Sequence, residues 1–343
     1  MKIDINAHIL PQKVQDILYQ HLGRKIAMLE SNPVLTNVEH RLHIMGKYEG
    51  LVQVLTPTGL PLEAVASPEK AAEMARVYND EMAELVHKYP DRFIAAVAIL
   101  PMNNMDAALK EADRAINELK FRGVLIYTPQ YVFDPSRTKW PPWVDSKPID
   151  NPEFIPLYEK MANYNLPIWI HPMREFSTPD YTTEDRSKYY VWQVFSWPFE
   201  TTVAMTRLVF SGILERYPNL KVITHHCGAM VPYLERRIRV SYDYAEMRHG
   251  RNYKQGLTKR PVDYFRMFYN DTAVSGSTAA LMCAHAFCGA EHLLFGTDMP
   301  YDSQIGDVAT RETIRSVEEM NITDAEKKMI FEDNAKRLLR LPI

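Results

Sequence analysis

The chain has 343 residues, 46% of them hydrophobic, and its formal net charge at pH 7 is -3. This composition provides for a large buried core and excludes disorder as the main state of the chain. The basic residues are dispersed, which argues against the concentrated Lys/Arg surface of a nucleic-acid-binding protein. We therefore expect the partner to be a small molecule that local charges recognise.

Cysteine usage and the absence of long apolar runs limit the cellular context. The three cysteines, Cys227, Cys283 and Cys288, show no Cys-x-x-Cys spacing. They predict neither a disulfide framework nor a cysteine-rich zinc site. The first residues lack a basic region followed by an apolar run, and no apolar run reaches the roughly 18 residues of a membrane span. We therefore expect a cytoplasmic protein without a signal peptide or membrane contact.

Short apolar segments alternate along the chain with longer amphipathic ones. The short segments are rich in Val, Ile, Leu and aromatic residues, which is typical of buried parallel strands. The predicted strands are residues 2–6, 51–55, 93–100, 123–127, 167–170, 221–224, 267–269 and 293–296. The predicted helices are residues 67–89, 104–119, 152–164, 200–217, 230–247 and 325–339. Pro68 favours the start of the first helix, and Thr323 is the expected N-cap of the last.

Eight predicted strands with helices between them indicate an α/β fold, a single closed (β/α)8 barrel over residues 1–343. The alternative, a doubly wound open sheet, would normally carry a glycine-rich phosphate loop after its first strand. Residues 7–11, which follow the first strand here, contain no glycine, so the barrel is favoured. Residues 134–151 are rich in Pro and Trp and lack periodicity, which predicts an insertion that either covers the substrate or is irregular.

Histidine or aspartate follows several of the predicted strands, at the barrel end where catalytic groups lie. These residues are His8 after the first strand, His171 after the fifth, His225 and His226 after the sixth, and Asp298 after the eighth. Eleven histidines occur in the whole chain, so this placement indicates a common site.

Imidazole and carboxylate groups are good ligands for zinc and similar divalent ions. A catalytic metal site uses about three protein ligands and leaves a position for water or substrate. His8, His171 and Asp298 supply such a set. Asn6 adds an oxygen donor, because residues two apart share one face of a strand.

Other polar residues near the strand ends have more ordinary interpretations. Adjacent strand residues face opposite sides, so we expect only one of His225 and His226 to face the site, and the pattern leaves open which. Glu200 lies near a predicted helix start, where a carboxylate favours the helix dipole, so we expect a capping role. Cys227 is expected to be a packing residue.

Five segments occur in the order and spacing of a known family. They are KIDINAHILP at 2–11, IHP at 170–172, PFETT at 198–202, THHCG at 224–228 with Pro232 after it, and FGTDMP at 295–300. Together they resemble the amidohydrolase-2 group, and within it the aminocarboxymuconate semialdehyde, γ-resorcylate and 5-carboxyvanillate decarboxylases. The resemblance spans nearly the whole chain.

The resemblance implies roles for individual residues. The first-strand His-x-His of the family, or Glu-x-His, falls on Asn6 and His8. The family's fifth-strand metal histidine falls on His171, and its eighth-strand aspartate falls on Asp298. The sixth-strand acid/base falls on His226, because a proline follows it at the family's spacing.

The resemblance also implies a subunit contact and shows departures from the family. The family's arginine that reaches a neighbouring subunit's substrate carboxylate falls on Arg237, which implies a homodimer or a higher homo-oligomer. Asn6 stands where the family has a stronger donor, so the site binds metal more weakly, prefers a harder ion such as Mn²⁺, or has lost metal. The first loop, which carries a substrate arginine in aminocarboxymuconate semialdehyde decarboxylase, is shorter here.

The resemblance implies non-oxidative decarboxylation of an aromatic or unsaturated carboxylic acid with one divalent ion, Zn or Mn. The ion would act as a Lewis acid on the carboxylate and a neighbouring oxygen. Asp298 would transfer the proton, with His226 as acid/base, and Arg237 would pair with the carboxylate. Aromatic residues beside the strand ends would stack on a flat substrate or simply pack in the core. These residues are Tyr127, Trp169, Trp197 and Tyr301.

Two alternatives remain open from the sequence. The same metal and Asp298 could activate water to hydrolyse a lactone, an amide or a C–C bond. Because Asn6 is a weak donor, the chain could instead be a metal-free barrel that only binds a ligand. The strand-end histidines and Asp298 favour an enzyme.

Overall fold

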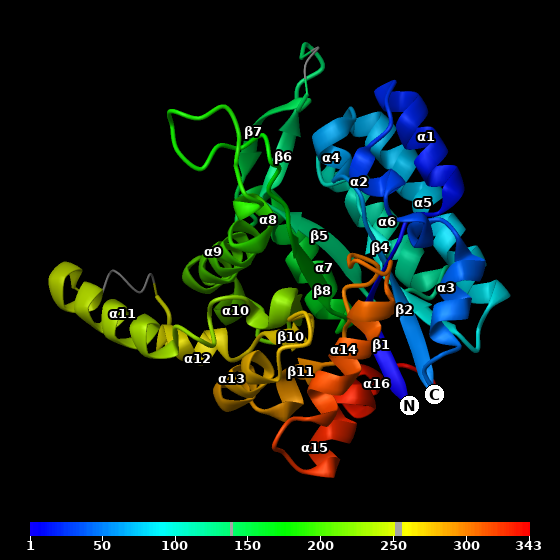
Figure 1. Ribbon diagram of the computed structural model, residues 1–343. Helices are drawn as coiled ribbons and strands as arrows, with labels where there is room; N and C mark the ends of the chain where they lie inside the picture. The colour runs from blue at the N-terminus through cyan, green and yellow to red at the C-terminus, as the bar shows by residue number, and fades with distance from the viewer. Residues whose placement is uncertain (138–139, 251–255) are drawn as a thin grey trace.

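Short, almost fully buried strands occupy the centre of the structure, and helices surround them (Figure 1). The computed structural model describes residues 1–137, 140–250 and 256–343. The strands are β1 (Lys2–Ile9), β2 (Leu51–Pro57), β3 (Phe93–Ala96), β4 (Ala98–Ile99), β5 (Val124–Thr128), β6 (Gln130–Phe133), β7 (Trp143–Lys147), β8 (Ile168–Pro172), β9 (Val222–Thr224), β10 (Tyr269–Asp271) and β11 (Leu293–Leu294).

All strands except the β6–β7 pair are joined in parallel ladders. One sheet has the order β1-β2-β3, and a second has the order β4-β5-β8-β9-β10-β11. β3 and β4 are two halves of one predicted strand, interrupted at Val97. On its other side β1 bonds to the chain after β11, where the N–H of Asp298 donates to the carbonyl of Asn6 (3.1 Å) and Ala7 pairs in parallel with Met299. The strand order is that of the predicted (β/α)8 barrel.

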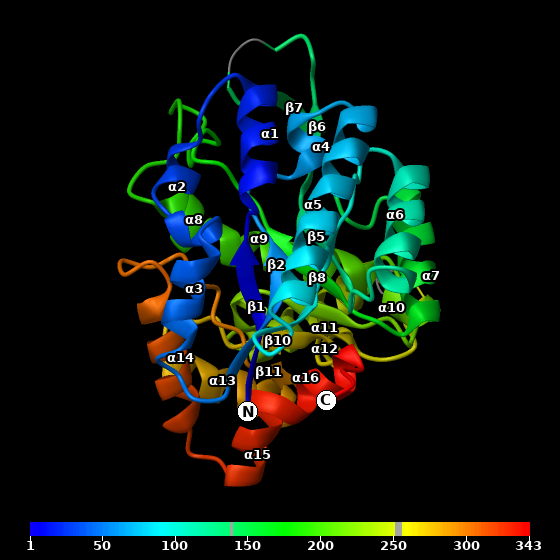
Figure 2. The same cartoon turned by 90° about the vertical axis from the view of Figure 1, so that its right-hand side faces the viewer.

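Helices cover the outside of the strands, as Figure 2 shows for α1, α3 and α5 beside β1 and β2. The helices are α1 (Gln12–Leu22), α2 (Ala27–Glu30), α3 (Val38–Met45), α4 (Leu62–Val65), α5 (Pro68–Lys88), α6 (Met105–Asn117), α7 (Ile155–Tyr164), α8 (Val191–Val194), α9 (Ser196–Phe210), α10 (Ile213–Arg216), α11 (Glu235–His249), α12 (Pro261–Phe265), α13 (Thr278–Cys288), α14 (Asp307–Glu318), α15 (Asp324–Lys328) and α16 (Asn334–Leu339). Within the described ranges, every helix is too short or too polar to cross a membrane.

The start predicted for the helix at 67–89 and the N-cap predicted at Thr323 are both confirmed by side-chain caps. The Ser67 hydroxyl accepts from the N–H of Lys70 (3.4 Å), which satisfies one of the free donors at the start of α5. Thr323 and Glu326 form a reciprocal capping box at α15, with both side-chain-to-backbone hydrogen bonds present. α5 then buries Ala71, Met74 and other small or apolar residues against β3 and β4.

Two predicted helices differ from the structure because of local backbone geometry. α9 begins at Ser196 rather than at position 200, since Pro198 is tolerated in a first helical turn. It ends at Phe210, and Gly212 follows with a left-handed φ of 74° that separates it from α10. The helix predicted from position 230 begins only at Glu235, after a turn containing several residues with positive φ.

The predicted insertion at 134–151 is wrong in one respect, because part of it is regular. β7 pairs antiparallel with β6, and the Tyr131 and Trp143 rings lie 4.7 Å apart. The sequence of residues 134–151 has no periodicity of its own, and β7 is regular because it pairs with β6, which lies before this segment. Positions 138 and 139 of the predicted insertion lie outside the described residues.

Candidate metal centre and active site

Three buried histidines meet at the carboxyl ends of the barrel strands. His8 comes from β1, His171 from β8, and His225 directly follows β9. Their ring centroids are 4.5 Å (His171 to His225), 5.2 Å (His8 to His171) and 5.8 Å (His8 to His225) apart. One nitrogen of each ring lies within 4.8 Å of one nitrogen of each of the others. Parallel strands of neighbouring segments bring these residues together because their carboxyl ends share one end of the barrel.

In each of the three rings, Nδ1 lies next to a backbone carbonyl oxygen. Nδ1 lies 3.1 Å from the carbonyl oxygen of Pro57 in His8, 2.7 Å from that of Pro172 in His171, and 2.9 Å from that of Ile170 in His225. A carbonyl oxygen only accepts, so Nδ1 carries a proton in each ring, and in a neutral ring Nε2 then keeps its lone pair. Nδ1 donation to a carbonyl is how metal-binding histidines are oriented.

Burial also keeps the imidazoles of His171 and His225 neutral, which metal binding requires. Desolvation is the main cause that lowers the pKa of His171 to about 3, and the neighbouring His8 is the second cause. Desolvation, followed by the neighbouring His171 and His8, holds the pKa of His225 well below its usual range. The donor set therefore fits a divalent ion such as zinc or manganese.

Asn6 completes this cluster through a contact with His225. Nε2 of His225 lies 2.9 Å from Oδ1 of Asn6. A neutral imidazole carries one proton, so with Nδ1 protonated the contact at Nε2 brings two lone pairs together. A cation at this position would stabilise both atoms, so Oδ1 of Asn6 is placed to bind the same ion.

Asp271 fixes the orientation of Asn6, and the sequence interpretation missed it. Nδ2 of Asn6 donates to Oδ2 of Asp271 (3.0 Å), which directs Oδ1 towards His225. The backbone N–H groups of Cys227 and Ala273 donate to the other carboxylate oxygen. Burial raises the pKa of Asp271 to about 6. Asp271 ends β10, so the strand-end rule that selected the histidines applies to it as well.

Asp298 and His226 form an ion pair beside the histidine cluster. Oδ1 of Asp298 lies 3.1 Å from Nε2 of His8, and Oδ2 lies 3.7 Å from Nε2 of His226. Burial opposes ionisation of Asp298, but the interactions with His226 and His8 hold its pKa well below the usual range. Burial likewise opposes protonation of His226, but Asp298 outweighs it and raises the pKa of His226. The pair therefore stores a proton on His226 next to a carboxylate.

Both histidines of the sixth strand face the site, so the expectation that only one would do so is wrong. β9 ends at Thr224, and His226 opens a tight turn with φ at 56°. The alternation of strand side chains no longer applies in that turn. Asp298 also has a positive φ, of 60°. Such strained backbone in non-glycine residues is typical of functional sites.

Three of the four predicted aromatic residues stand at the site. The rings of Tyr127 and Trp197 lie 5.3 and 5.7 Å from that of His171, and the ring of Tyr301 lies 5.8 Å from that of His8. Trp169 is fully buried in the barrel, where its ring covers Gly123 so closely that a Cβ there would lie 2.6 Å away. Trp169 is therefore a packing residue.

A cavity of about 570 Å³ opens next to this site. Trp197, His226, Asp298 and Tyr301 line it, and in the part of the chain that the structure describes neither lysine nor arginine does. A neighbouring cavity shares Tyr301 with it and is lined by Trp140 of the β6–β7 connection. The predicted insertion thus contributes to the barrel mouth.

Two predicted residues lie elsewhere. Arg237 is exposed on α11, which extends away from the barrel in Figure 1, so the structure does not bring it to the site of its own chain. Glu200 is the fifth residue of α9 and does not cap it. Its carboxylate lies 3.9 Å from the Arg174 guanidinium instead.

A family model described as amidohydrolase matches residues 3–341. The chain belongs to this family. The γ-resorcylate decarboxylase of Polaromonas sp. (strain JS666) is 29% identical to this amidohydrolase over 314 residues, covering 88% of this chain and 87% of that protein. The 2-amino-3-carboxymuconate-6-semialdehyde decarboxylase of Dictyostelium discoideum is 25% identical over 365 residues, with 99% and 92% covered.

Solved structures of decarboxylases are also similar to this chain. A 2,6-dihydroxybenzoate decarboxylase from Rhizobium superimposes with a TM-score of 0.80 at 25% identity, covering 99% of this chain and 98% of that one. A dihydroxybenzoic acid decarboxylase from Polaromonas sp. JS666, solved with manganese and the inhibitor 2-nitroresorcinol, gives a TM-score of 0.80 at 26% identity, with 100% and 97% covered. These relatives confirm the predicted barrel, the predicted metal-dependent carboxy-lyase class and the predicted divalent metal cofactor.

Proposed function

We propose that this amidohydrolase removes carbon dioxide non-oxidatively from a hydroxylated aromatic carboxylic acid. The observation that carries the proposal is the convergence of three buried imidazoles beside the Asp298–His226 ion pair. One group of residues can hold a divalent ion, and the other can supply a proton. The similarity to decarboxylases of dihydroxybenzoates supports this substrate class.

His8, His171 and His225 would hold the ion, with oxygen donors from Asn6 and Asp298. When bound, the ion supplies Lewis-acid polarisation of the substrate carboxylate and of an adjacent hydroxyl oxygen. The two oxygen donors favour manganese over zinc, because manganese prefers oxygen ligands more strongly. The manganese in the similar Polaromonas structure supports the same choice.

The proton would come from the Asp298–His226 pair. His226 holds it at Nε2 and transfers it to Oδ2 of Asp298, 3.7 Å away. Asp298 then delivers it to the ring carbon that bears the carboxylate. The bond to the carboxylate carbon breaks, its electron pair restores the aromatic ring, and carbon dioxide leaves. Trp197 and Tyr301 would hold the flat ring between them.

A homodimer would complete the site. The cavity beside the metal centre has no lysine or arginine from the described part of its own chain, whereas α11 presents Arg237 outside the barrel. On the same helix Val240, Tyr244 and Met247 are exposed and follow the spacing of one helical face. An exposed apolar face of this kind marks a protein contact. A second copy packed on α11 would bring Arg237 towards the partner's substrate carboxylate.

We place the enzyme in the cytoplasm. All three cysteines are free thiols, which suits a reducing compartment. Cell fractionation with an antibody against the protein would test this placement. Recovery in a membrane or extracellular fraction would contradict it.

The test of the proposed function uses 2,6-dihydroxybenzoate in heavy water with manganese-loaded enzyme. We expect carbon dioxide and resorcinol in equal amounts, with deuterium on the ring carbon that lost the carboxylate. Metal content per chain is measured on the same sample by elemental analysis. Release of bicarbonate rather than carbon dioxide as the first product would instead indicate a hydrolase, and turnover without bound metal would contradict the role of the histidines.

A further inference from the structure

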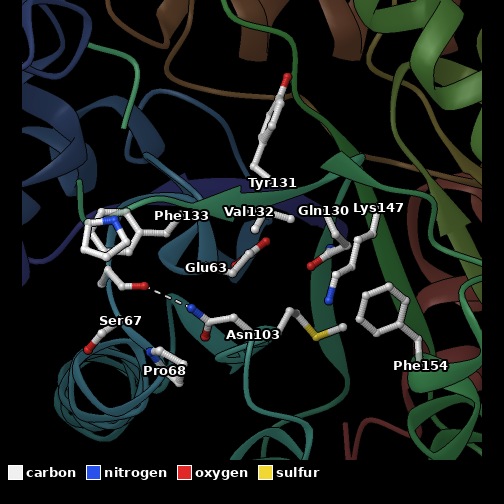
Figure 3. A pocket seen from close by; sticks show the side chains of 13 residues that line it. Glu63, Ser67, Pro68, Asn103, Gln130, Tyr131, Val132, Phe133, Lys147 and Phe154 are labelled. Carbon is white, nitrogen blue, oxygen red and sulfur yellow. Dashed lines mark hydrogen bonds between the residues drawn. The ribbon is translucent and has the colours of Figure 1, made fainter. Parts of the chain in front are cut away.

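A second cavity, separate from the metal centre, lies between α4, the start of α6 and the β6–β7 hairpin (Figure 3). Its volume is about 280 Å³, close to the lower limit of roughly 300 Å³ for small-molecule sites. It shares no lining residue with the cavity that contains His226 and Asp298. Much of its wall is apolar, including Met102, Phe133 and Phe154.

A buried carboxyl group stands at the centre of this cavity. Glu63 is only 3% exposed, and no residue that the structure describes bonds to its Oε1. In Figure 3 its carboxyl lies among the other lining side chains. A buried polar atom without a partner costs free energy, so a group that bonds to Oε1 would stabilise the site.

Two amide side chains present further acceptors in the same cavity. Gln130 is 2% exposed, and its Nε2 donates to the carbonyl of Tyr127. Nδ2 of Asn103 donates to the carbonyl of Ala66 (2.9 Å), the bond drawn in Figure 3. With their NH₂ groups occupied, Oε1 of Gln130 and Oδ1 of Asn103 are buried acceptors that receive no hydrogen bond within the described ranges. The two backbone carbonyls thus bind the NH₂ group of each amide and leave its oxygen available to a ligand.

The chemistry of the missing partner follows from these three oxygens. They accept hydrogen bonds and one belongs to an ionisable acid, so the complementary group is a cationic donor. We propose that this cavity is a binding site for a small organic amine, with its ammonium group on Glu63, Gln130 and Asn103 and its apolar body on the aromatic wall. Nothing in this proposal depends on the decarboxylase reaction.

Lys147 does not argue for an anionic ligand instead. Its Nζ lies 2.9 Å from Oε1 of Glu153, so its charge is already paired at the edge of the cavity. An anion would also meet the two amide oxygens, which offer it no donor, and it would oppose ionisation of the Glu63 carboxyl. The polar part of the wall therefore favours a donor over an acceptor.

Amine binding should release a proton. Burial raises the pKa of Glu63 to about 8, so the carboxyl is protonated at neutral pH. An ammonium group stabilises the carboxylate, so the proton leaves when the amine binds. The heat of binding then depends on the ionisation enthalpy of the buffer, which gives a signature that a merely apolar cavity would not produce.

The experiment is calorimetric titration of the manganese-loaded protein with 2-phenylethylamine at pH 7 in two buffers of different ionisation enthalpy. We expect saturable binding with proton release, and no binding of 3-phenylpropionate, which has the same apolar body and a carboxylate in place of the amine. Glu63→Gln should weaken amine binding about tenfold or more, since hydrogen bonds to charged groups are the strong ones. The matched control Glu69→Gln, on the exposed first turn of α5, should bind as the wild type does.

Several results would overturn the proposal. They are equal amine affinity in wild type and Glu63→Gln, binding without proton release, preference for the carboxylate probe, and no binding at millimolar amine. Abolition of the amine signal by potassium or sodium chloride at equal concentration would assign the site to an inorganic cation instead. The wild-type proton release is independent of any variant, so poor folding of Glu63→Gln would not remove the test.

Discussion

The metal centre and the Glu63 cavity use the backbone in the same way for different purposes. In both, a carbonyl oxygen holds one polar atom of a side chain and so directs the other: Nδ1 of His171 is held and Nε2 is left, just as Nε2 of Gln130 is held and Oε1 is left. At the metal centre the atoms left over are imidazole nitrogens, which bind metal. In the Glu63 cavity they are oxygens, which bind hydrogen-bond donors. The type of atom that the backbone leaves unbonded, nitrogen or oxygen, therefore decides what each site can bind, and burial alone does not.

The largest effect should come from the proton carrier. Asp298→Asn removes the carboxylate that relays the proton but leaves the three imidazoles in place, so turnover of 2,6-dihydroxybenzoate should fall about 10²- to 10⁴-fold. At saturating manganese, metal content should stay near that of the wild type, because the new asparagine still offers an oxygen donor. The kinetic assay and elemental analysis are run on the same sample. Turnover close to that of the wild type would remove Asp298 from the mechanism.

The adjacent histidines provide the sharpest division of roles. His225→Ala removes a proposed ligand, so manganese affinity should fall by more than about 100-fold, beyond the 10- to 100-fold loss that outer-shell changes cause. His226→Ala should keep the metal and lose turnover. Each variant serves as the control for the other in a metal-buffered titration. The reverse result would mean that His226, not His225, belongs to the metal set.

A smaller effect should follow from the residue behind Asn6. In Asp271→Asn the acceptor for Nδ2 of Asn6 is weakened, so Oδ1 is less firmly directed towards His225. We expect a 10- to 100-fold loss of manganese affinity. Apo-protein unfolding temperature is measured alongside to separate this loss from general destabilisation. Unchanged affinity in a folded variant would show that Asn6 is held by other contacts.

The effect that is smallest per pH unit should appear at Glu63, in the pH dependence of stability. The folded protein keeps this proton up to a pKa of about 8, whereas the unfolded chain releases it at the ordinary value of 4.5. The stabilisation is therefore complete below about pH 4.5 and is lost as pH rises towards 8. Between these values it falls by at most about 1.4 kcal/mol per pH unit. Urea unfolding of Glu63→Gln should lack this slope, and equal slopes in both proteins would place the carboxyl in water.

The barrel could be predicted because buried parallel strands leave a strong local pattern. The strand-end rule predicted that His8, His171 and Asp298 lie close together, as they do in the structure, because the rule follows from the fold alone. The orientation of His225 was out of reach, since it depends on a left-handed turn at His226. The role of Asn6 depends on Asp271, which is 265 positions away in the chain. Long-range partners of this kind leave no periodic signal.

The remote position of Arg237 has a genetic consequence if two copies share each site. A chain carrying Asp298→Asn still offers an intact arginine, and a chain carrying Arg237→Ala still offers an intact metal centre. Mixed in one pair, the two defective chains would restore one complete site out of two. Co-expression of two alleles that are inactive alone should therefore recover part of the activity, whereas both changes placed on the same chain should leave nothing to rescue.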